Sequence, residues 1–203
     1  MDVRYWYESI QMNDNDTIEL FPSTLYKTRY NLKVEKVDSI IDFTNTLEYN
    51  QYKFTSDTHI LDHSIFSDIK CFIEKHIDSY LLRVLRKNPR LERLTMTQSW
   101  LNKLGVHEYR RAHTHPNSVL SGVFYIGYPK DKFSTLNFLS PFFSGFDDIN
   151  FQHFPRAGEL IIFPSYLRHW VEPNRSDNDR ISIAFNTFPL PGWGDEQGLT
   201  QIE

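Results

Sequence analysis

The chain has 203 residues, of which 40% are hydrophobic and 15% aromatic, so it can bury a substantial core and has the size of one large domain. Its 22 lysine and arginine residues are outnumbered by 26 aspartate and glutamate residues, giving a formal net charge of -4. This balance argues against a nucleic-acid duplex as the partner, because such a partner selects a basic surface.

Residues 1–5 lack the apolar core of a signal peptide, and no apolar run approaches the roughly 20 residues that cross a bilayer. The single cysteine, Cys71, cannot form an internal disulfide, which favours a reducing compartment. We interpret Cys71 as a small buried hydrophobic residue. The sequence therefore predicts a soluble cytoplasmic protein without a membrane partner.

In the N-terminal half, residues 17–21 and 23–26 have the pattern of short strands, and residues 37–47 that of a helix. Apolar residues at three- and four-residue steps predict a long helix over about 63–87, packed against the outer face of a sheet. His59, His63 and His76 belong to this region, and we expect surface or packing roles for them.

From residue 94 onward the chain becomes a series of short β segments separated by turn residues, which indicates a sandwich or jelly roll. An aromatic loop over 140–155 contains Phe142, Phe143 and Phe146, which could exclude water from a site. The tail from Pro189 is predicted to be irregular. The expected strands are 94–104, 108–115, 119–128, 135–139, 159–164, 169–172 and 180–188.

Two histidines stand at alternate positions of one predicted strand. His113 and His115 would point to the same side of that strand, so both imidazoles could reach one metal ion. His169, which follows an apolar strand, is the best candidate for a third ligand. The alternative is that these histidines bind no metal. His113 and His115 would then be polar surface residues, and His169 a partly buried residue hydrogen-bonded to backbone.

Arg180 begins the apolar segment 181–185, and Ser182 lies on the same face of that strand. A planar guanidinium beside a hydroxyl is well matched to a carboxylate, because arginine donates two parallel hydrogen bonds. The alternative is a surface arginine at a strand start, since residues 177–179 before it form a turn.

These motifs, taken in order, resemble the Fe(II)- and 2-oxoglutarate-dependent oxygenases, most closely a subgroup found in bacteria and phages. The resemblance rests on segments 97–102, 113–125, 158–174 and 180–186 and covers roughly residues 20–188. It implies a mainly β fold with flanking helices, a double-stranded β-helix or cupin-like jelly roll. One domain would span 1–203, with bracing elements in 1–93, the jelly-roll core in 94–188 and an irregular tail in 189–203. For a phage-encoded chain the compartment would be the host cytoplasm.

The resemblance also implies the cofactors Fe(II) and 2-oxoglutarate. In this chemistry 2-oxoglutarate is a co-substrate that is decarboxylated to succinate and CO₂. A C–H bond of an unknown prime substrate is oxidised at the same time, most simply by hydroxylation. Nucleic acid is an unfavoured partner, and a homo-oligomer is compatible with the sequence. Tyr109 is a weaker candidate for lining the pocket. The implied site residues are His113, His115 and His169 for the metal, and Arg180, Ser182, Tyr125 and Asn102 for the co-substrate.

One departure from the family pattern leaves the ligand set open. The usual triad has Asp or Glu two residues after the first histidine, whereas His115 stands in that position here. Three readings are possible: His113 and His115 both bind, or His115 is the first ligand with Asn117 in the carboxylate position, or two histidines bind alone. A cupin-type three-histidine dioxygenase that does not use 2-oxoglutarate and a non-catalytic β-sandwich binding module are the competing functions.

Overall fold

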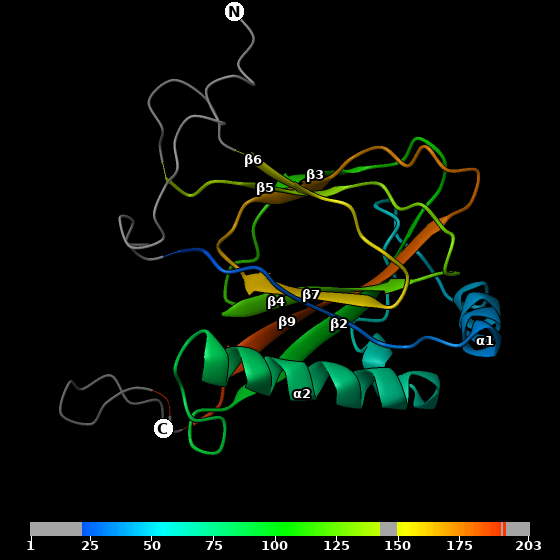
Figure 1. Cartoon of the computed structure of the whole chain (residues 1–203). Coiled ribbons are helices and arrows are strands. Elements are labelled where there is room, and N and C mark those ends of the chain that lie inside the picture. The colour runs from blue at the N-terminus through cyan, green and yellow to red at the C-terminus, as the bar shows by residue number, and fades with distance from the viewer. Residues whose placement is uncertain (1–21, 143–149, 192, 194–203) are drawn as a thin grey trace, which may run out of the picture.

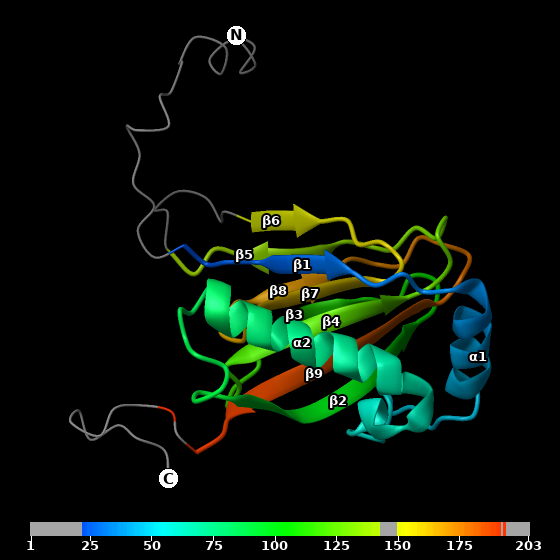
Figure 2. The same cartoon turned by 60° about the horizontal axis from the view of Figure 1, so that its bottom comes forward.

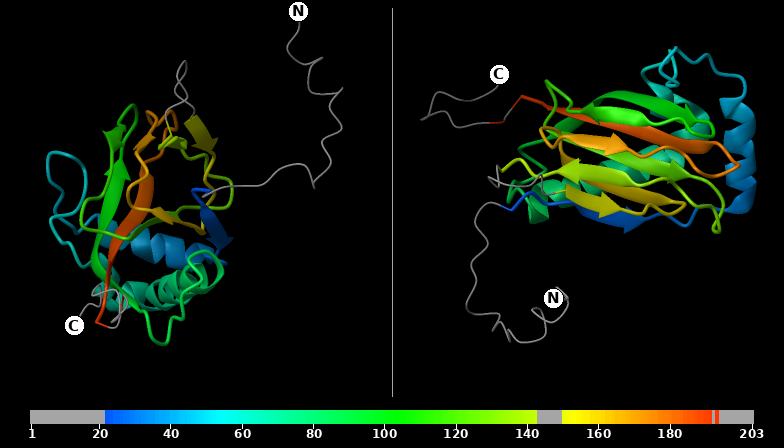
Figure 3. Two further views of the ribbon diagram at one scale, coloured as in Figure 1. Left: turned by 90° about the vertical axis from the view of Figure 1, so that its left-hand side faces the viewer. Right: turned by 90° about the horizontal axis from the view of Figure 1, so that it is seen from above.

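The computed structural model describes residues 22–142, 150–191 and 193, and its core is a sandwich of two antiparallel sheets that face each other (Figure 1). The larger sheet has the order β1-β7-β4-β9-β2 and the smaller has the order β3-β8-β5-β6. Figure 3 shows the smaller sheet from above, lying over the larger one. The strands are β1 (Tyr26–Arg29), β2 (Leu94–Leu104), β3 (Arg110–His113), β4 (Leu120–Ile126), β5 (Leu136–Leu139), β6 (Asn150–His153), β7 (Glu159–Pro164), β8 (His169–Val171) and β9 (Arg180–Pro189).

Two helices brace the larger sheet from outside. Helix α2 (Ser67–Arg83) lies across β7, β4 and β9, and α1 (Val34–Thr44) stands at one end of the sandwich (Figure 2). Ile69, Ile73 and Ile77 recur at four-residue steps on α2 and are fully buried against the sheet. The predicted packing of this helix on an outer sheet face is confirmed.

Both helices differ from the prediction in their bounds. Two short 3₁₀ turns, η2 (Ile60–Asp62) and η3 (Ser64–Phe66), precede α2, so the α-helix is shorter at both ends than the predicted 63–87. Helix α1 lies three residues earlier than the predicted 37–47. The neighbouring histidines have surface or packing roles, as expected: His63 is exposed and contacts Asp57 at 2.7 Å, and His76 shares a 2.7 Å hydrogen bond with Tyr26.

Successive side chains of β9 belong to different faces of the larger sheet. Ile181, Ile183 and Phe185 join the core under α2, whereas Arg180 and Ser182 face the smaller sheet. Gly122 on β4 leaves room for the Phe185 ring, because a Cβ at this position would lie 2.2 Å from a ring carbon. The alternation gives one strand both a structural side and a side available for chemistry.

Three other expectations need correction or fall outside the described part of the chain. Strand β6 (Asn150–His153) occupies the end of the segment that we predicted to be a loop. Cys71 is exposed rather than buried. The predicted strand 17–21, together with Phe143 and Phe146, lies outside the described residues. Among the described residues, no helix combines the length and apolarity that crossing a membrane requires.

Candidate functional site

The chain crosses from the smaller to the larger sheet between β3 and β4, and returns between β7 and β8. The two crossings lie side by side and are joined by backbone hydrogen bonds. The amide of His115 donates to the carbonyl of Ser165 at 3.1 Å, and the amide of Ser165 donates to the carbonyl of Val119 at 3.0 Å. Segments 50 residues apart in sequence are thereby held together at one site, with an imidazole on each.

Three histidines converge where the crossings meet. His113 on β3 is the direct cross-strand neighbour of His169 on β8, and His115 follows two residues later. The ring centroids lie 4.4 Å apart for His113 and His169, 5.0 Å for His115 and His169, and 5.1 Å for His113 and His115. One ligand nitrogen from each ring lies within 4.8 Å of the others, an arrangement that could hold a metal ion.

Each imidazole has a protein acceptor next to its Nδ1 atom. Nδ1 of His113 lies 2.8 Å from the carbonyl of Arg111, and Nδ1 of His169 lies 2.9 Å from the carbonyl of Leu167. Nδ1 of His115 contacts the side-chain oxygen of Asn186. An Nδ1–H that donates to such an acceptor fixes the tautomer and leaves the Nε2 lone pair for a metal.

Burial keeps the deeper imidazoles neutral. His169 is 4% exposed and its ring stacks edge-on against Phe163 with centroids 4.8 Å apart. Desolvation lowers the pKa of His169 to about 3, opposed by its hydrogen bond to the Leu167 carbonyl. Desolvation also lowers the pKa of His115. Neutral imidazoles are the form that binds metals.

Arg180 is buried, and neither of its hydrogen-bond partners among the described residues is an anion. Its side chain is 4% exposed; one terminal nitrogen donates to the Ser182 hydroxyl at 3.1 Å and the other to the Tyr125 hydroxyl at 3.2 Å. The Nε atom is buried and has no hydrogen-bond partner among the described residues. Burial lowers the pKa of Arg180 and raises that of Tyr125 to about 12, so the phenol stays neutral beside a guanidinium that remains charged. A buried cation with only neutral partners is costly, and an anionic ligand would offset that cost.

The histidines and Arg180 line one cavity of about 520 Å³ between the sheets, within the usual range for small-molecule sites. Its lining includes two arginines and three histidines, and no aspartate or glutamate among the described residues. Apolar walls come mainly from Trp100, Val123 and Leu136. A second hollow of about 650 Å³, which includes Phe133, lies elsewhere and contains none of the predicted site residues.

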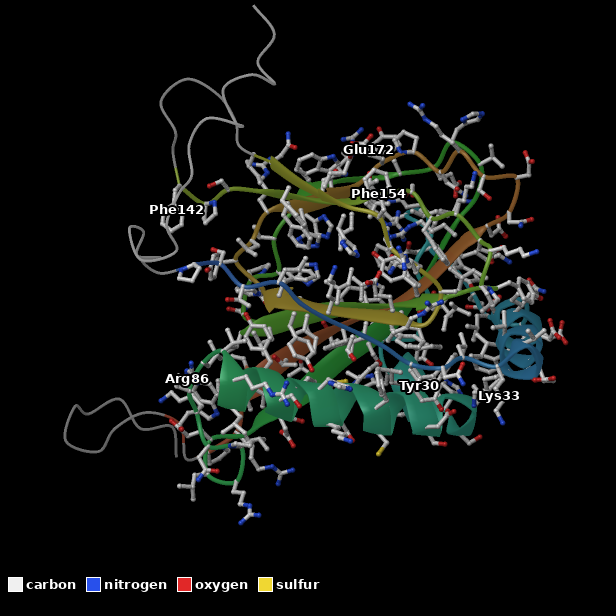
Figure 4. The ribbon with its side chains drawn as sticks, viewed as in Figure 1. Tyr30, Lys33, Arg86, Phe142, Phe154 and Glu172 are labelled. Carbon is white, nitrogen blue, oxygen red and sulfur yellow. The ribbon has the colours of Figure 1, made fainter. Side chains whose placement is uncertain are left out.

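The other predicted residues divide between the cavity and its surroundings. Asn102 lines the cavity, and Tyr125 lies behind Arg180 rather than in the lining. Tyr109 is 49% exposed and does not line the cavity, so that weaker expectation is wrong. Phe142 is 62% exposed and points away from the space between the sheets (Figure 4), so it excludes no water from this cavity.

Asn117, the alternative ligand, also lies outside the cavity lining. It is exposed in the turn between β3 and β4 and has a positive φ of 58°. Asparagine tolerates this left-handed conformation better than most residues, which accounts for it at the turn. The geometry thus assembles the three imidazoles and leaves Asn117 aside.

Sequence reasoning missed several polar residues of the cavity, and two of them contact predicted site residues. Asn186, the partner of His115, stands on the same face of β9 as Arg180 and Ser182, so the two-residue period could have identified it. Arg110 enters the cavity from β3 and donates to the side-chain oxygen of Asn102 at 3.2 Å. No local pattern marks Arg110, because its position depends on how the two sheets face each other.

A two-sheet antiparallel jelly roll with a histidine cluster and a buried arginine between its sheets is an arrangement that metal-dependent oxygenases use. The family model described as "Putative 2OG-Fe(II) oxygenase" matches residues 98–186, which contain all three histidines and Arg180. Residues 98–186 are therefore similar to the 2OG-Fe(II) oxygenase domain, whose family uses Fe(II) and 2-oxoglutarate.

Solved structures agree on the fold. A prolyl-4-hydroxylase from Pseudomonas putida superposes with a TM-score of 0.57 at 13% identity, covering 82% of this chain and 92% of that one. A 2OG-Fe(II) oxygenase family oxidoreductase from Burkholderia pseudomallei gives 0.56 at 11% identity, with coverage of 81% and 84%. HygX from Streptomyces hygroscopicus, with nickel, 2-oxoglutarate and hygromycin B bound, gives 0.57 at 12% identity, with coverage of 82% and 83%. These likenesses confirm the double-stranded β-helix. A search of curated proteins finds no match.

Proposed function

We propose that this oxygenase is a hydroxylase of a small molecule, with His113, His115 and His169 holding Fe(II) and Arg180 binding the distal carboxylate of 2-oxoglutarate. The observation that carries the proposal is the buried Arg180 guanidinium, which has no anionic hydrogen-bond partner in the described part of the chain and lines the same cavity as the histidine cluster. A dicarboxylate that spans the cavity would supply that anion and place its other end at the metal.

The donor set suits iron. Imidazole nitrogen is a common ligand for Fe(II), and three such ligands leave positions open for a chelating co-substrate and dioxygen. Three neutral ligands leave the site with a higher net charge than two histidines and a carboxylate would, which favours an anionic co-substrate. The second-sphere acceptors at Arg111, Leu167 and Asn186 orient the rings toward a common point.

The end of the cavity at Arg180 is equally suited to binding a carboxylate. Each terminal nitrogen of Arg180 uses one hydrogen on a neighbouring hydroxyl and keeps a second, and this pair can bind a carboxylate in bidentate fashion. Ser182 lines the cavity and accepts from Arg180, so its own hydroxyl hydrogen can add a third bond. Tyr125 holds the guanidinium from behind, with its ring centroid 5.0 Å from the Arg180 Cζ atom.

When bound, Fe(II) and 2-oxoglutarate supply the oxidation, in which one molecule of dioxygen converts the co-substrate to succinate and CO₂ and a C–H bond of the prime substrate to C–OH. The chain's own residues bind and orient. Arg180 and Ser182 fix the co-substrate, the histidines fix the metal, and Val123 and Leu136 exclude water from the interior of the cavity.

The test is succinate formation by the full chain with Fe(II), 2-oxoglutarate and dioxygen, together with metal binding measured without oxygen. We expect one metal ion per chain and metal-dependent succinate formation. Metal binding without any 2-oxoglutarate binding would instead support a three-histidine dioxygenase. Absence of stoichiometric metal binding would leave only a non-catalytic module.

A further inference from the structure

Two edge strands, β2 of the larger sheet and β3 of the smaller, line one side of the cavity, and we take the gap between these two edges as its mouth. A segment before α2 extends the rim along β2, since Phe54 forms an isolated bridge with Asn102 and His59 with Ser99. Trp100 on β2 faces the cavity with its ring centroid 5.8 Å from that of His115. This rim is not needed for the metal or for the distal carboxylate of the co-substrate, so it is available to the prime substrate.

Arg110 stands at this mouth and spans it. It is half-buried on β3, donates to Asn102 on β2, and its Cζ atom lies 5.7 Å from the Phe54 ring centroid. Among the described residues, the Arg110 guanidinium donates a single hydrogen bond, the one to Asn102. The nearest acid in sequence, Glu108, is committed elsewhere, to Lys53 at 3.3 Å and to the amide of Gly105 at 2.8 Å.

A second cation in a cavity that already holds Arg180 is a cost that an anionic ligand would relieve. Desolvation first, and then the charge of Arg180, lower the pKa of Arg110 to about 10 against the opposing charge of Glu108, so Arg110 stays protonated at neutral pH. One dicarboxylate can neutralise Arg180 and the metal end of the cavity. It leaves Arg110, at the mouth, without an ion-pair partner among the described residues, since Glu108 acts on it only through its charge at a distance.

We propose that Arg110 binds a carboxylate of the prime substrate, which is a small organic acid whose apolar body lies against Trp100 while its reacting carbon faces the histidine cluster. This inference rests on the proposed function and names its substrate class. Asn102, which contacts Arg110, and Trp100, which lies beside His115, are two residues apart on one face of β2, a separation of roughly 7 Å. A substrate that spans this distance has its oxidised carbon several bonds from its carboxylate. A phosphate monoester shares the anion chemistry and is distinguished by the test.

The experiment measures binding by calorimetry to the full chain loaded with Ni(II) and saturating 2-oxoglutarate, so that no turnover occurs. The probes are matched pairs of an acid and its neutral amide, hexanoate with hexanamide and 3-phenylpropionate with 3-phenylpropionamide, plus 2-phenylethylphosphonate. Arg110→Gln removes the charge, and Arg110→Lys keeps it without the planar fork. Arg111→Gln is the matched control, because the Arg111 side chain is exposed and outside the cavity lining, and the substitution keeps the backbone carbonyl that His113 contacts.

We expect at least one acid to bind about tenfold or more tightly than its amide in the wild type and in Arg111→Gln. Arg110→Gln should abolish this preference and leave 2-oxoglutarate affinity unchanged, and Arg110→Lys should keep part of the preference. Equal binding of both acids and their amides, or loss of 2-oxoglutarate binding in Arg110→Gln, overturns the proposal. Tighter binding of the phosphonate than of 3-phenylpropionate overturns the carboxylate in favour of a phosphate ester. A chain that binds neither nickel nor 2-oxoglutarate refutes the proposed function itself.

Discussion

The two faces of the larger sheet are formed by the same strands but have different roles. The face under α2 is an apolar core in which Ile181, Ile183 and Phe185 are almost completely buried. The face toward the smaller sheet has a second apolar cluster, which includes Tyr125, Ile161 and Phe163, and beside it Arg180 and Ser182 line an open cavity. Neighbouring residues of β9 therefore have different roles. On this strand, substitutions on the face under α2 should change stability, and substitutions of Arg180 and Ser182 should change ligand binding.

The largest effect is expected for Phe185→Ala on the core face. Removing a fully buried ring that packs over Gly122 should lower the free energy of unfolding by about 3–5 kcal/mol. Phe188→Ala, a change of the same size on the same strand at a side chain that is 44% exposed, is the matched control. Chemical denaturation measures both. Equal losses for the two variants would show that the face under α2 is not the main source of stability.

Arg180→Met tests the cavity face. Loss of the buried cation should weaken 2-oxoglutarate binding by about 2–5 kcal/mol, because a desolvated carboxylate loses its partner. The ligand-free variant should be at least as stable as the wild type, since a buried unpaired charge is replaced by an apolar chain. Calorimetry with Ni(II) gives the first quantity and thermal denaturation the second. Unchanged affinity would remove Arg180 from the co-substrate site.

Asn186→Ala should have a smaller effect that is specific to the metal. Without Asn186, Nδ1 of His115 keeps only the Ser121 hydroxyl at 2.9 Å, which can donate as well as accept, so the tautomer is less firmly fixed and metal affinity should fall, by up to about 10- to 100-fold. Asn186→Asp keeps an acceptor at this position and should restore most of the affinity. If the aspartate variant were as weak as the alanine variant, Asn186 would have a packing role only.

The smallest effect is a pH dependence of stability in the metal-free protein. The pKa of His169 is about 3 when folded and about 6.5 when unfolded, so the unfolded chain takes up a proton first as pH falls. The stability from the neutral His169 is fully present above pH 6.5 and declines below it, by at most about 1.4 kcal/mol per pH unit. The free-energy difference between the wild type and His169→Gln should therefore shrink between pH 7 and pH 5. A constant difference would mean that His169 is not held in an apolar environment.

Much of this division could be predicted from the sequence. The bounds of β2 and β7 coincide with the predicted strands, and the two-residue period placed Ser182 beside Arg180. The sequence analysis missed β6 because this strand has only four residues and lies in the segment 140–155, which begins with aromatic and turn-forming residues. Arg110 was missed because its place in the cavity follows from the contact between β2 and β3, which no local pattern encodes.

The most direct test of the account is a crystal structure of the chain with Ni(II) and 2-oxoglutarate bound. We predict that Nε2 atoms of His113, His115 and His169 all contact the metal and that the distal carboxylate of 2-oxoglutarate pairs with Arg180. A metal held without His113, or a co-substrate whose distal carboxylate pairs with Arg110 instead, would contradict the account.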